Sequence, residues 1–448
     1  MRIAYIAAGA AGMYCGSCLH DNTLAAALLE LGEDVLLVPT YTPLRTDEAN
    51  VSIDRVFFGG INVYLQQKAA VFRHTPWWLD RVLDNPALLN LATRGAGSVD
   101  PRELGDMTVS MLRGEAGNQR KELEKLVHWL ISDVKPDIVH LSNSMQLGMA
   151  RLLRERCGPP LVCQLSGEDL FLEKLPPPHY DKARALLRER AADADAFVAI
   201  NRYYADFMAD YLAVDRSRIH VIAHGLRLTS HATRQPPAPP GVSGKVSSAS
   251  KRNATEPRVV GFLARICEDK GLHLLVEACE LLAQRDDIPP FVLHAAGYLG
   301  ANDRPYLESL EARAAAGPLA GRFKYSGELN LNQKIAFLQS LDVMSVPTVY
   351  RESKGLPALE AMANAVPVVL PDHGSFTEMI ADTGGGLLCR PHDPADLAEK
   401  IAELLGDPAR AAELGNAGQR AIHDRYNAGA MARKTRELYQ QLNRKPSC

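Results

Sequence analysis

Short apolar runs, each closed by glycine, proline or a polar loop, recur through the first half of the chain. Runs of this length are typical of strands buried in a parallel sheet. The stretch from about residue 20 to 31, ended by Gly32, predicts the helix that joins the first two strands. The pattern predicts a doubly wound α/β domain with strands at residues 3–8, 35–38, 136–140, 161–165, 196–200 and 219–222.

The second half repeats this alternation. Leu356, Leu359, Met362 and Ala363 fall on one helical stripe, which Pro367 closes before the next strand. From about residue 395 onward the pattern is helical. A second doubly wound domain is therefore predicted, with strands at residues 259–263, 292–297, 323–327, 343–346, 368–370 and 387–389.

A change in composition separates the two halves. Proline, serine and lysine dominate residues 229–257, and such a stretch cannot bury a core. We expect an N-terminal domain at 1–228, a flexible linker at 229–257 and a C-terminal domain at 258–425. The last segment, 426–448, is predicted to be a helix that packs back on the first domain.

Composition then narrows the class of protein. The net charge of −3 argues against general nucleic-acid binding. No apolar run reaches the roughly 18 residues of a membrane span, and the first run is too short for a secretory signal. Eight cysteines lie scattered without the spacing of a disulfide framework, which predicts a reducing, cytoplasmic compartment. Peripheral contact with a membrane surface stays open.

The most informative stretch is 341–370, which alternates strand, loop, helix and strand. Its loop lies at the carboxyl end of a parallel strand, where open α/β sheets bind ligands. Backbone N–H groups of Lys354, Gly355 and Leu356 at the helix start favour an anion such as phosphate. Glu352 and Glu360 are acceptors that suit hydroxyl groups. Phosphates and hydroxyls together indicate a nucleotide-sugar.

This stretch resembles the E-x7-E signature of the retaining glycosyltransferases of family 4. The resemblance implies the GT-B fold, an α/β architecture of two doubly wound Rossmann-like domains that face a central cleft. It also implies that Glu352 faces the donor sugar and Glu360 the ribose hydroxyls. The matching positions are Asp342, Pro347, Glu352, Gly355, Glu360, Ala361, Met362, Pro367 and Val368.

A second motif supports the resemblance. Arg265 and Lys270 match the family pattern G-R-x-x-x-x-K-G, with Ala264 in place of its first glycine. The family assigns this arginine and lysine to the donor diphosphate, where they would stabilise the charge of the leaving group. Arg265, Lys270 and Glu352 are therefore the candidate catalytic residues. Gly297 and Gly327 lie where the base of the donor is expected.

The acceptor side is expected in the first domain. The first loop carries Gly9 and Gly12, which lack the full dinucleotide fingerprint and so disfavour a nicotinamide dehydrogenase. In the family this loop approaches the acceptor and the donor phosphates. Ser142 and Ser166 stand where the family carries histidines. Beside Ser166, two acids are acceptor-side candidates or, alternatively, caps of the next helix: Glu168 and Asp169.

Three further features of the sequence can be interpreted as local structure rather than as functional sites. Cys15 and Cys18 form a C-x-x-C, but with no second pair the prediction is two thiols in a loop rather than a zinc or redox site. Trp77 and Trp78 can stack on an acceptor sugar or belong to the core. Residues 59–65 are predicted to be a strand edge.

The predicted activity is retaining transfer of a sugar from a UDP-, GDP- or ADP-linked donor to a carbohydrate, lipid or small-molecule acceptor. No metal and no further cofactor are expected, because Arg265 and Lys270 supply the positive charge. A phosphorylase or an epimerase of the same fold is a rival enzyme class. The missing histidines favour another rival, a catalytically weakened nucleotide-sugar-binding protein.

Overall fold

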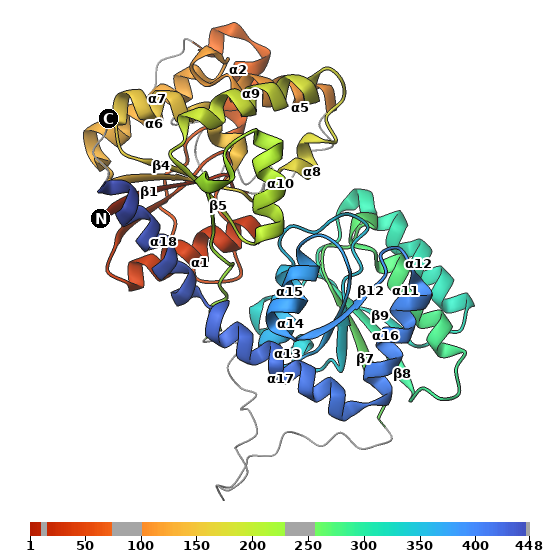
Figure 1. Cartoon of the computed structure of the whole chain (residues 1–448). Helices are drawn as coiled ribbons and strands as arrows, with labels where there is room; N and C mark the ends of the chain where they lie inside the picture. The colour runs from red at the N-terminus through yellow and green to blue at the C-terminus, as the bar shows by residue number, and fades with distance from the viewer. Residues whose placement is uncertain (10–15, 74–100, 229–255, 445–448) are drawn as a thin grey trace, which may run out of the picture. The chain divides into compact units, whose positions relative to one another are not determined.

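The computed structural model describes residues 1–9, 16–73, 101–228 and 256–444. These residues form two compact units, shown in Figure 1. The first unit is Met1–Gly225 with Ala428–Cys448, and the second unit is Leu226–Asn427. Each unit contains a six-stranded parallel sheet with helices on its faces. The two doubly wound domains predicted from the apolar pattern are thus confirmed as a fold class.

The sheet of the first unit has the strand order β2-β1-β3-β4-β5-β6. Every neighbouring pair is parallel; Ile3 of β1, for example, lies opposite Val35 on one side and Ile138 on the other. The order reverses beside β1, so the loop after β1 opens at a switch point of the sheet. The strands are β1 (Arg2–Ala7), β2 (Asp34–Pro39), β3 (Ile138–Leu141), β4 (Leu161–Gln164), β5 (Ala196–Ala199) and β6 (Ile219–Val221).

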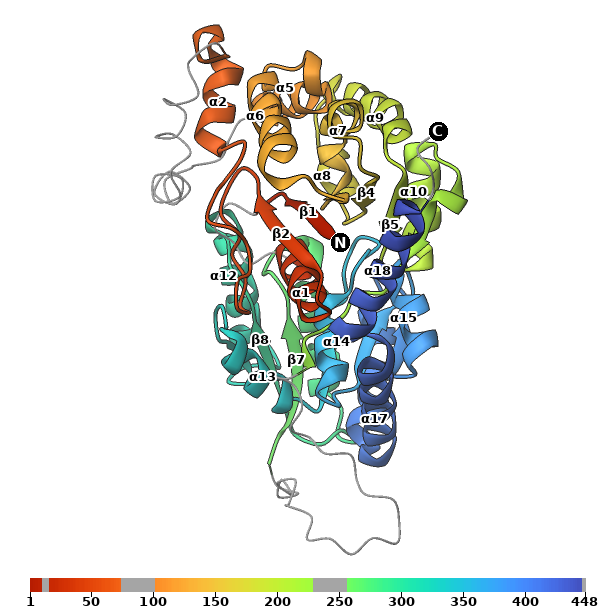
Figure 2. The same ribbon diagram turned by 90° about the vertical axis from the view of Figure 1, so that its left-hand side faces the viewer.

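Both faces of this sheet are covered by helices, and alternate residues of β1 enter different cores. Ile3 and Tyr5 pack with α1 and α18, whereas Ala4 and Ile6 pack with α6, α7 and α9. Figure 2 shows α18 beside α1 on the face they share. The helices are α1 (Gly16–Glu30), α2 (Gly60–Lys68), α5 (Pro101–Leu112), α6 (Arg120–Trp129), α7 (Ala150–Cys157), α8 (Asp169–Leu172), α9 (His179–Arg190), α10 (Arg202–Leu212) and α18 (Ala428–Asn443).

The second unit has the order β12-β11-β10-β7-β8-β9, again with parallel neighbours. Its core joins both faces of the sheet with α11, α14 and α16. The strands are β7 (Arg258–Leu263), β8 (Phe291–Ala296), β9 (Phe323–Tyr325), β10 (Val343–Ser345), β11 (Val368–Pro371) and β12 (Gly386–Cys389). The helices are α11 (Leu272–Ala283), α12 (Arg304–Ala316), α13 (Leu331–Gln339), α14 (Leu356–Ala363), α15 (Ser375–Thr383), α16 (Pro394–Gly406) and α17 (Pro408–Arg425).

The strand predicted at residues 59–65 is wrong, because this segment begins α2. Its Ile, Val and Tyr content favoured a strand. In the structure Val63 and Gln66 are buried while Tyr64 is exposed, which is helical spacing. Gln66 donates from Nε2 to Glu122 on α6 at 2.7 Å, so a long-range contact fixes this helix.

Other sequence predictions agree with the structure only in part or fall outside the residues that it describes. The stripe that starts at Leu356 is helix α14, but the helix ends at Ala363 rather than at Pro367, because Ala365 takes a left-handed backbone conformation with φ of 57°. Cys18 lies buried in α1 and not in a loop. Gly12, Cys15, Trp77 and Trp78 lie outside the described residues, as does nearly all of the linker predicted at 229–257.

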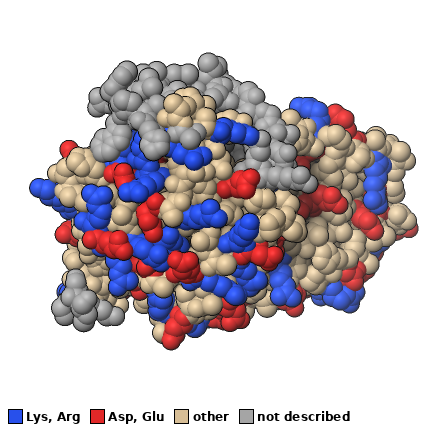
Figure 3. Space-filling view, turned by 90° about the horizontal axis from the view of Figure 1, so that it is seen from above, with Lys and Arg blue, Asp and Glu red and all other residues tan. Residues whose placement is uncertain are grey.

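Among the described residues on the face shown in Figure 3, Lys and Arg are interspersed with Asp and Glu, so these residues give that face no one-sided basic field. Among the helices of the described ranges, none is long and apolar enough to cross a membrane.

The C-terminal helix α18 contributes a buried aromatic anchor to the first unit. Tyr439 is fully buried, and its hydroxyl bonds with Nδ1 of His140 on β3. The His140 ring stacks on Tyr5 with ring centroids 4.4 Å apart. Burial, with a smaller contribution from His20, lowers the pKa of His140 to about 3, so this imidazole stays neutral at physiological pH.

Tyr439→Ala should therefore destabilise the first unit. Removing a fully buried aromatic side chain leaves a cavity that costs about 3–5 kcal/mol in the free energy of unfolding. Urea denaturation followed by circular dichroism measures this loss. The neighbouring exposed residue provides the control, and Gln440→Ala should change the free energy by less than about 0.5 kcal/mol. An equal effect of both variants would contradict the anchor role of Tyr439.

Candidate active site

Three loops meet at the carboxyl edge of the second sheet. Because β10 lies between β7 and β11, the loop after β10 is flanked by the loops after those two strands. The N–H of Val349 donates to the carbonyl of Asp269 at 3.0 Å, and the N–H of Ser375 donates to the carbonyl of Glu352 at 2.8 Å. These backbone bonds fix the loop that carries Glu352 on both sides.

Two glycines permit this close approach. Gly271 has φ of 76°, and a Cβ there would lie 1.8 Å from the carbonyl oxygen of Pro347. Gly374 has φ of 61°, and its Cβ would lie 2.6 Å from the carbonyl oxygen of Glu352. Both positions exclude a side chain on steric and conformational grounds.

Glu352 is buried and fully engaged at this edge. Its Oε1 accepts the N–H groups of Ser353 and Lys354, each at 3.1 Å. Its Oε2 accepts from Lys270 Nζ at 2.6 Å and from the Tyr350 hydroxyl at 2.8 Å. Lys270 also donates to the Tyr350 oxygen, and its ammonium lies 4.9 Å from the centre of the Tyr350 ring.

The ion pair decides the charge of Glu352. Burial by itself raises the pKa of a carboxyl group, but the Lys270 ammonium, the Lys354 amide and the Tyr350 hydroxyl outweigh burial and lower the pKa of Glu352 to about 2. The carboxylate is therefore ionised at any physiological pH. Lys270 and Glu352, both predicted from sequence as site residues, form one buried ion pair.

Glu360 has a partner that the sequence analysis missed. Lys334 of α13 donates from Nζ to Oε1 of Glu360 at 2.5 Å, and both side chains are largely buried. Lys334 lies 26 residues earlier in the chain, on a helix that follows a different strand. No local motif points to it. The second acid of the E-x7-E spacing is thus held as a buried ion pair as well.

The expected anion-binding amides are only partly available. The N–H of Lys354, expected to point at a ligand, donates to Glu352 instead. The amides of Gly355 and Leu356 begin α14, where the first N–H groups of a helix have no intrahelical acceptor. Arg265 extends from the loop after β7 with an exposed side chain, and its Nε donates to Cys267 Sγ at 3.3 Å.

The two glycines predicted near the donor base lie together. The N–H of Gly297 donates to the carbonyl of Gly327 at 2.9 Å, which joins the ends of β8 and β9. Gly297 has φ of 139°, and a Cβ there would lie 1.8 Å from the carbonyl oxygen of Ala264. Space around Gly327 is open, with no heavy atom within 4 Å of a Cβ built there.

In the first unit, the predicted acceptor-side residues also come together, at the ends of β1, β3 and β4. Ser142 Oγ accepts the N–H of Ala8 at 3.1 Å, next to Gly9. The Ser166 hydroxyl donates to the Ser142 carbonyl at 2.9 Å. Gly9 itself has φ of 74°, and a Cβ there would lie 2.5 Å from the carbonyl of Thr42.

The two acids of this edge are buried and bonded. Glu168 accepts the N–H of Ser144 at 2.8 Å and that of Ser166 at 2.6 Å, one on each oxygen. Burial raises the pKa of Glu168, and these hydrogen bonds oppose the rise. Asp169 accepts from the Tyr204 hydroxyl at 2.6 Å. Glu168 occupies the N-cap position of α8 but makes no side-chain capping bond, which disfavours the capping alternative for it.

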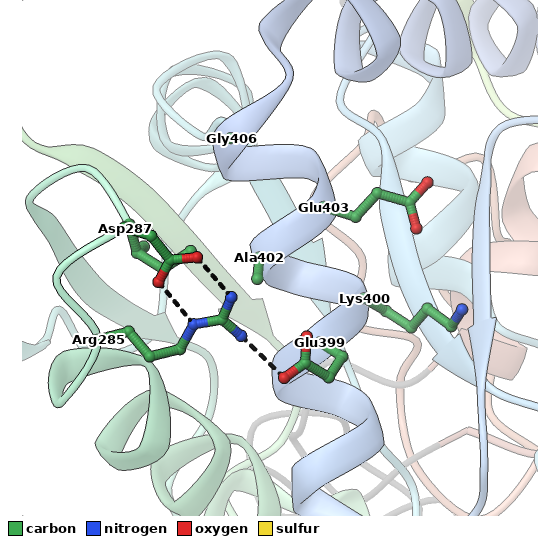
Figure 4. A pocket seen from close by; sticks show the side chains of 8 residues that line it. Arg285, Asp287, Glu399, Lys400, Ala402, Glu403 and Gly406 are labelled. Atoms are coloured by element: carbon green, nitrogen blue, oxygen red, sulfur yellow. Dashed lines mark hydrogen bonds and ion pairs between the residues drawn. The ribbon is translucent and has the colours of Figure 1, made fainter.

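A separate groove of about 360 Å³ lies on the second unit, between the α11–β8 loop and α16 (Figure 4). Arg285 spans it with bonds of 2.8 Å to Asp287 and to Glu399. None of the predicted site residues lines this groove, so it is not the candidate active site.

Comparison with known proteins gives two family matches. A model described as "Glycosyl transferase 4-like domain" matches residues 22–225, and one described as "Glycosyl transferases group 1" matches residues 245–421. Together these matches cover parts of both units.

Similar proteins carry related names. The chain is 32% identical over 56% of its length to alpha-maltose-1-phosphate synthase of Mycolicibacterium smegmatis, and 28% identical over 71% of its length to D-inositol 3-phosphate glycosyltransferase of Salinispora tropica. Each match spans 64% of the relative, slightly less than two thirds. The solved structure of Anabaena Alr3699/HepE in complex with UDP has the same fold, with a TM-score of 0.66, 17% identity, and coverage of 98% of this chain and 100% of that one.

Because of the Lys270–Glu352 pair, we expect the second unit to lose stability as the pH falls into the acid range. Because the folded-state pKa of Glu352, about 2, is below its ordinary value of 4.5, its contribution is fully present above about pH 4.5 and is lost as the pH falls toward 2. The difference in free energy of unfolding between the wild type and Glu352→Gln should shrink by about 3 kcal/mol over this range. Urea titrations at pH 6 to 2 measure it.

The exposed Glu403→Gln on α16 is the matched control. Its difference from the wild type should change by less than about 0.5 kcal/mol over the same pH range. If the difference in free energy of unfolding between the wild type and Glu352→Gln also stayed constant with pH, the ionised pair would be refuted.

Proposed function

The chain belongs to the GT-B glycosyltransferases of family-4 type, and we propose that it transfers a sugar from a nucleotide-sugar to an acceptor hydroxyl with retention of anomeric configuration. The observation that carries this proposal is the buried Lys270–Glu352 pair at the carboxyl edge of the second sheet. Exposed Arg265 stands on the same loop as Lys270. This edge combines cations for phosphates with a carboxylate for hydroxyls, as a nucleotide-sugar requires.

Lys270 and Arg265 are proposed to hold the donor diphosphate. Lys270 has three N–H bonds, of which Glu352 and Tyr350 take two, so one remains for a phosphate oxygen. Arg265 can add a bidentate contact. Both would stabilise the charge that develops as the diphosphate leaves, without a metal ion or a further cofactor.

Glu360 is proposed to accept the ribose hydroxyls, with Lys334 holding its carboxylate in place. Gly297 and Gly327 would leave room for the base. UDP is the first nucleotide to test, because Anabaena HepE, which has the same fold, was solved with UDP. GDP- and ADP-linked donors remain in the proposal.

The first unit is proposed to supply the acceptor. Glu168 positions the loops of Ser144 and Ser166 rather than acting as a base, since each of its oxygens already accepts an amide. The bond from the anomeric carbon to the phosphate oxygen breaks, and the acceptor oxygen bonds to the same face of that carbon. The acceptor proton passes to the leaving phosphate oxygen. The names of the two relatives favour a carbohydrate or a polyol phosphate as the acceptor, and a lipid or another small molecule remains in the proposal.

We place this reaction in the cytoplasm. The cysteines of the described ranges are free thiols, which fits a reducing compartment: Cys18, Cys157, Cys163, Cys267, Cys279 and Cys389.

A second candidate is a nucleotide-sugar-binding protein without turnover. Ser142 and Ser166 occupy the places of the family histidines, and the Ser142 hydroxyl is engaged with the Ala8 amide. Donor binding is common to both candidates, so only turnover separates them.

A panel of UDP-, GDP- and ADP-linked sugars should include a donor that raises the melting temperature, because a ligand of the native state stabilises it by mass action. Thermal shift detects the binding, and released nucleoside diphosphate measures hydrolysis or transfer to mixed acceptors. Binding with turnover supports the transferase, and binding without turnover supports the second candidate. No shift with any donor would overturn both.

Lys270→Ala and Glu352→Ala should each lower the transfer rate by at least about 100-fold. Each variant leaves the other member of the ion pair without its partner and removes a proposed contact with the nucleotide-sugar. Initial rates at saturating acceptor measure this, with circular dichroism to verify the fold. The exposed Lys324→Ala in the same unit is the control for lost positive charge and should stay within about twofold of the wild type. Near-normal rates for either site variant would refute the donor-site assignment.

A further inference from the structure

Glu352 has no acceptor capacity left for a sugar hydroxyl. An ionised carboxylate offers about four lone-pair positions on its two oxygens. The structure fills all four, with Ser353 N–H, Lys354 N–H, Lys270 Nζ and the Tyr350 hydroxyl. If Glu352 faces the donor sugar, one of these donors has to leave when the sugar arrives.

The four donors differ in how easily they can leave. The amides of Ser353 and Lys354 belong to the loop that Gly374 and Ser375 hold in place. Withdrawing Lys270 would leave a buried carboxylate without its counter-charge, which is strongly unfavourable. The Tyr350 hydroxyl is neutral, and a sugar hydroxyl can replace it bond for bond.

The surroundings of Tyr350 are compatible with its displacement. Tyr350 is only partly buried, and its neighbour Val349 is 37% exposed. Its ring lies against the Lys270 ammonium, a contact that does not require the hydroxyl.

We propose that the Tyr350 hydroxyl holds the place of a donor-sugar hydroxyl on Oε2 of Glu352 and is exchanged for it when the nucleotide-sugar binds. This inference rests on the proposed function. Tyr350 acts through Glu352 and is therefore a positioning residue. The exchange breaks the bond that the Tyr350 hydroxyl donates to Glu352 and the bond that its oxygen accepts from Lys270, whereas a bare nucleoside diphosphate leaves both bonds intact. The Tyr350 hydroxyl therefore lowers the affinity for a nucleotide-sugar relative to the affinity for the nucleoside diphosphate.

Tyr350→Phe tests the exchange, because it keeps the ring and removes only the hydroxyl. The dissociation constants of three matched pairs are measured by calorimetry: UDP and UDP-glucose, GDP and GDP-mannose, ADP and ADP-glucose. For the pair that binds, the ratio of the Kd of the diphosphate to the Kd of the sugar form should rise at least about fivefold, the factor expected for one net hydrogen bond. Binding of the diphosphate alone should change by less than about twofold.

Tyr306→Phe is the matched control, since it removes another partly buried tyrosine hydroxyl of the second unit, one that bonds with His273. Its ratio should equal that of the wild type.

An unchanged or lower ratio in Tyr350→Phe, with the diphosphate still bound, overturns the exchange and indicates that Tyr350 only supports Glu352. If none of the three diphosphates binds to the wild type, the proposed function is overturned, and this inference with it. The two failures are thus distinguishable.

Discussion

A carboxylate buried at the end of a parallel strand is stable only if cations and N–H donors replace the water that it has lost. Glu352 meets this condition with two amides of its own loop, the Tyr350 hydroxyl and the Lys270 ammonium. Lys270 comes from the loop after β7, 82 residues away in sequence. The pair therefore connects neighbouring strand ends, and the proposed donor chemistry depends on that connection.

The sheet makes this pairing possible. Placing β10 between β7 and β11 brings three loops into backbone contact, and Gly271 and Gly374 allow an approach that a Cβ would block. The loop is thereby held before any ligand arrives, so binding does not have to order it. The same edge carries the Lys334–Glu360 pair, which satisfies a second buried acid in the same way.

The first unit uses its strand ends differently. Glu168 joins the loops after β3 and β4 through two amides, and Ser142 and Ser166 extend this network to the loop after β1. The result is an edge whose polar groups mostly bond to one another. Positive charge and ionised carboxylate meet at the edge of the second unit, which explains why the donor chemistry is assigned there.

The sequence by itself determined the two parallel sheets, because short apolar runs closed by glycine, proline or a polar loop alternate with helical patterns along the chain. The resemblance to the family motifs also singled out Glu352, Lys270 and Glu360 as candidate site residues. Only the tertiary structure revealed α2 in place of a strand, Lys334 as the partner of Glu360, and the saturation of Glu352 that includes Tyr350. These features depend on which strand ends and helices become neighbours, and strand order sets that proximity independently of local pattern.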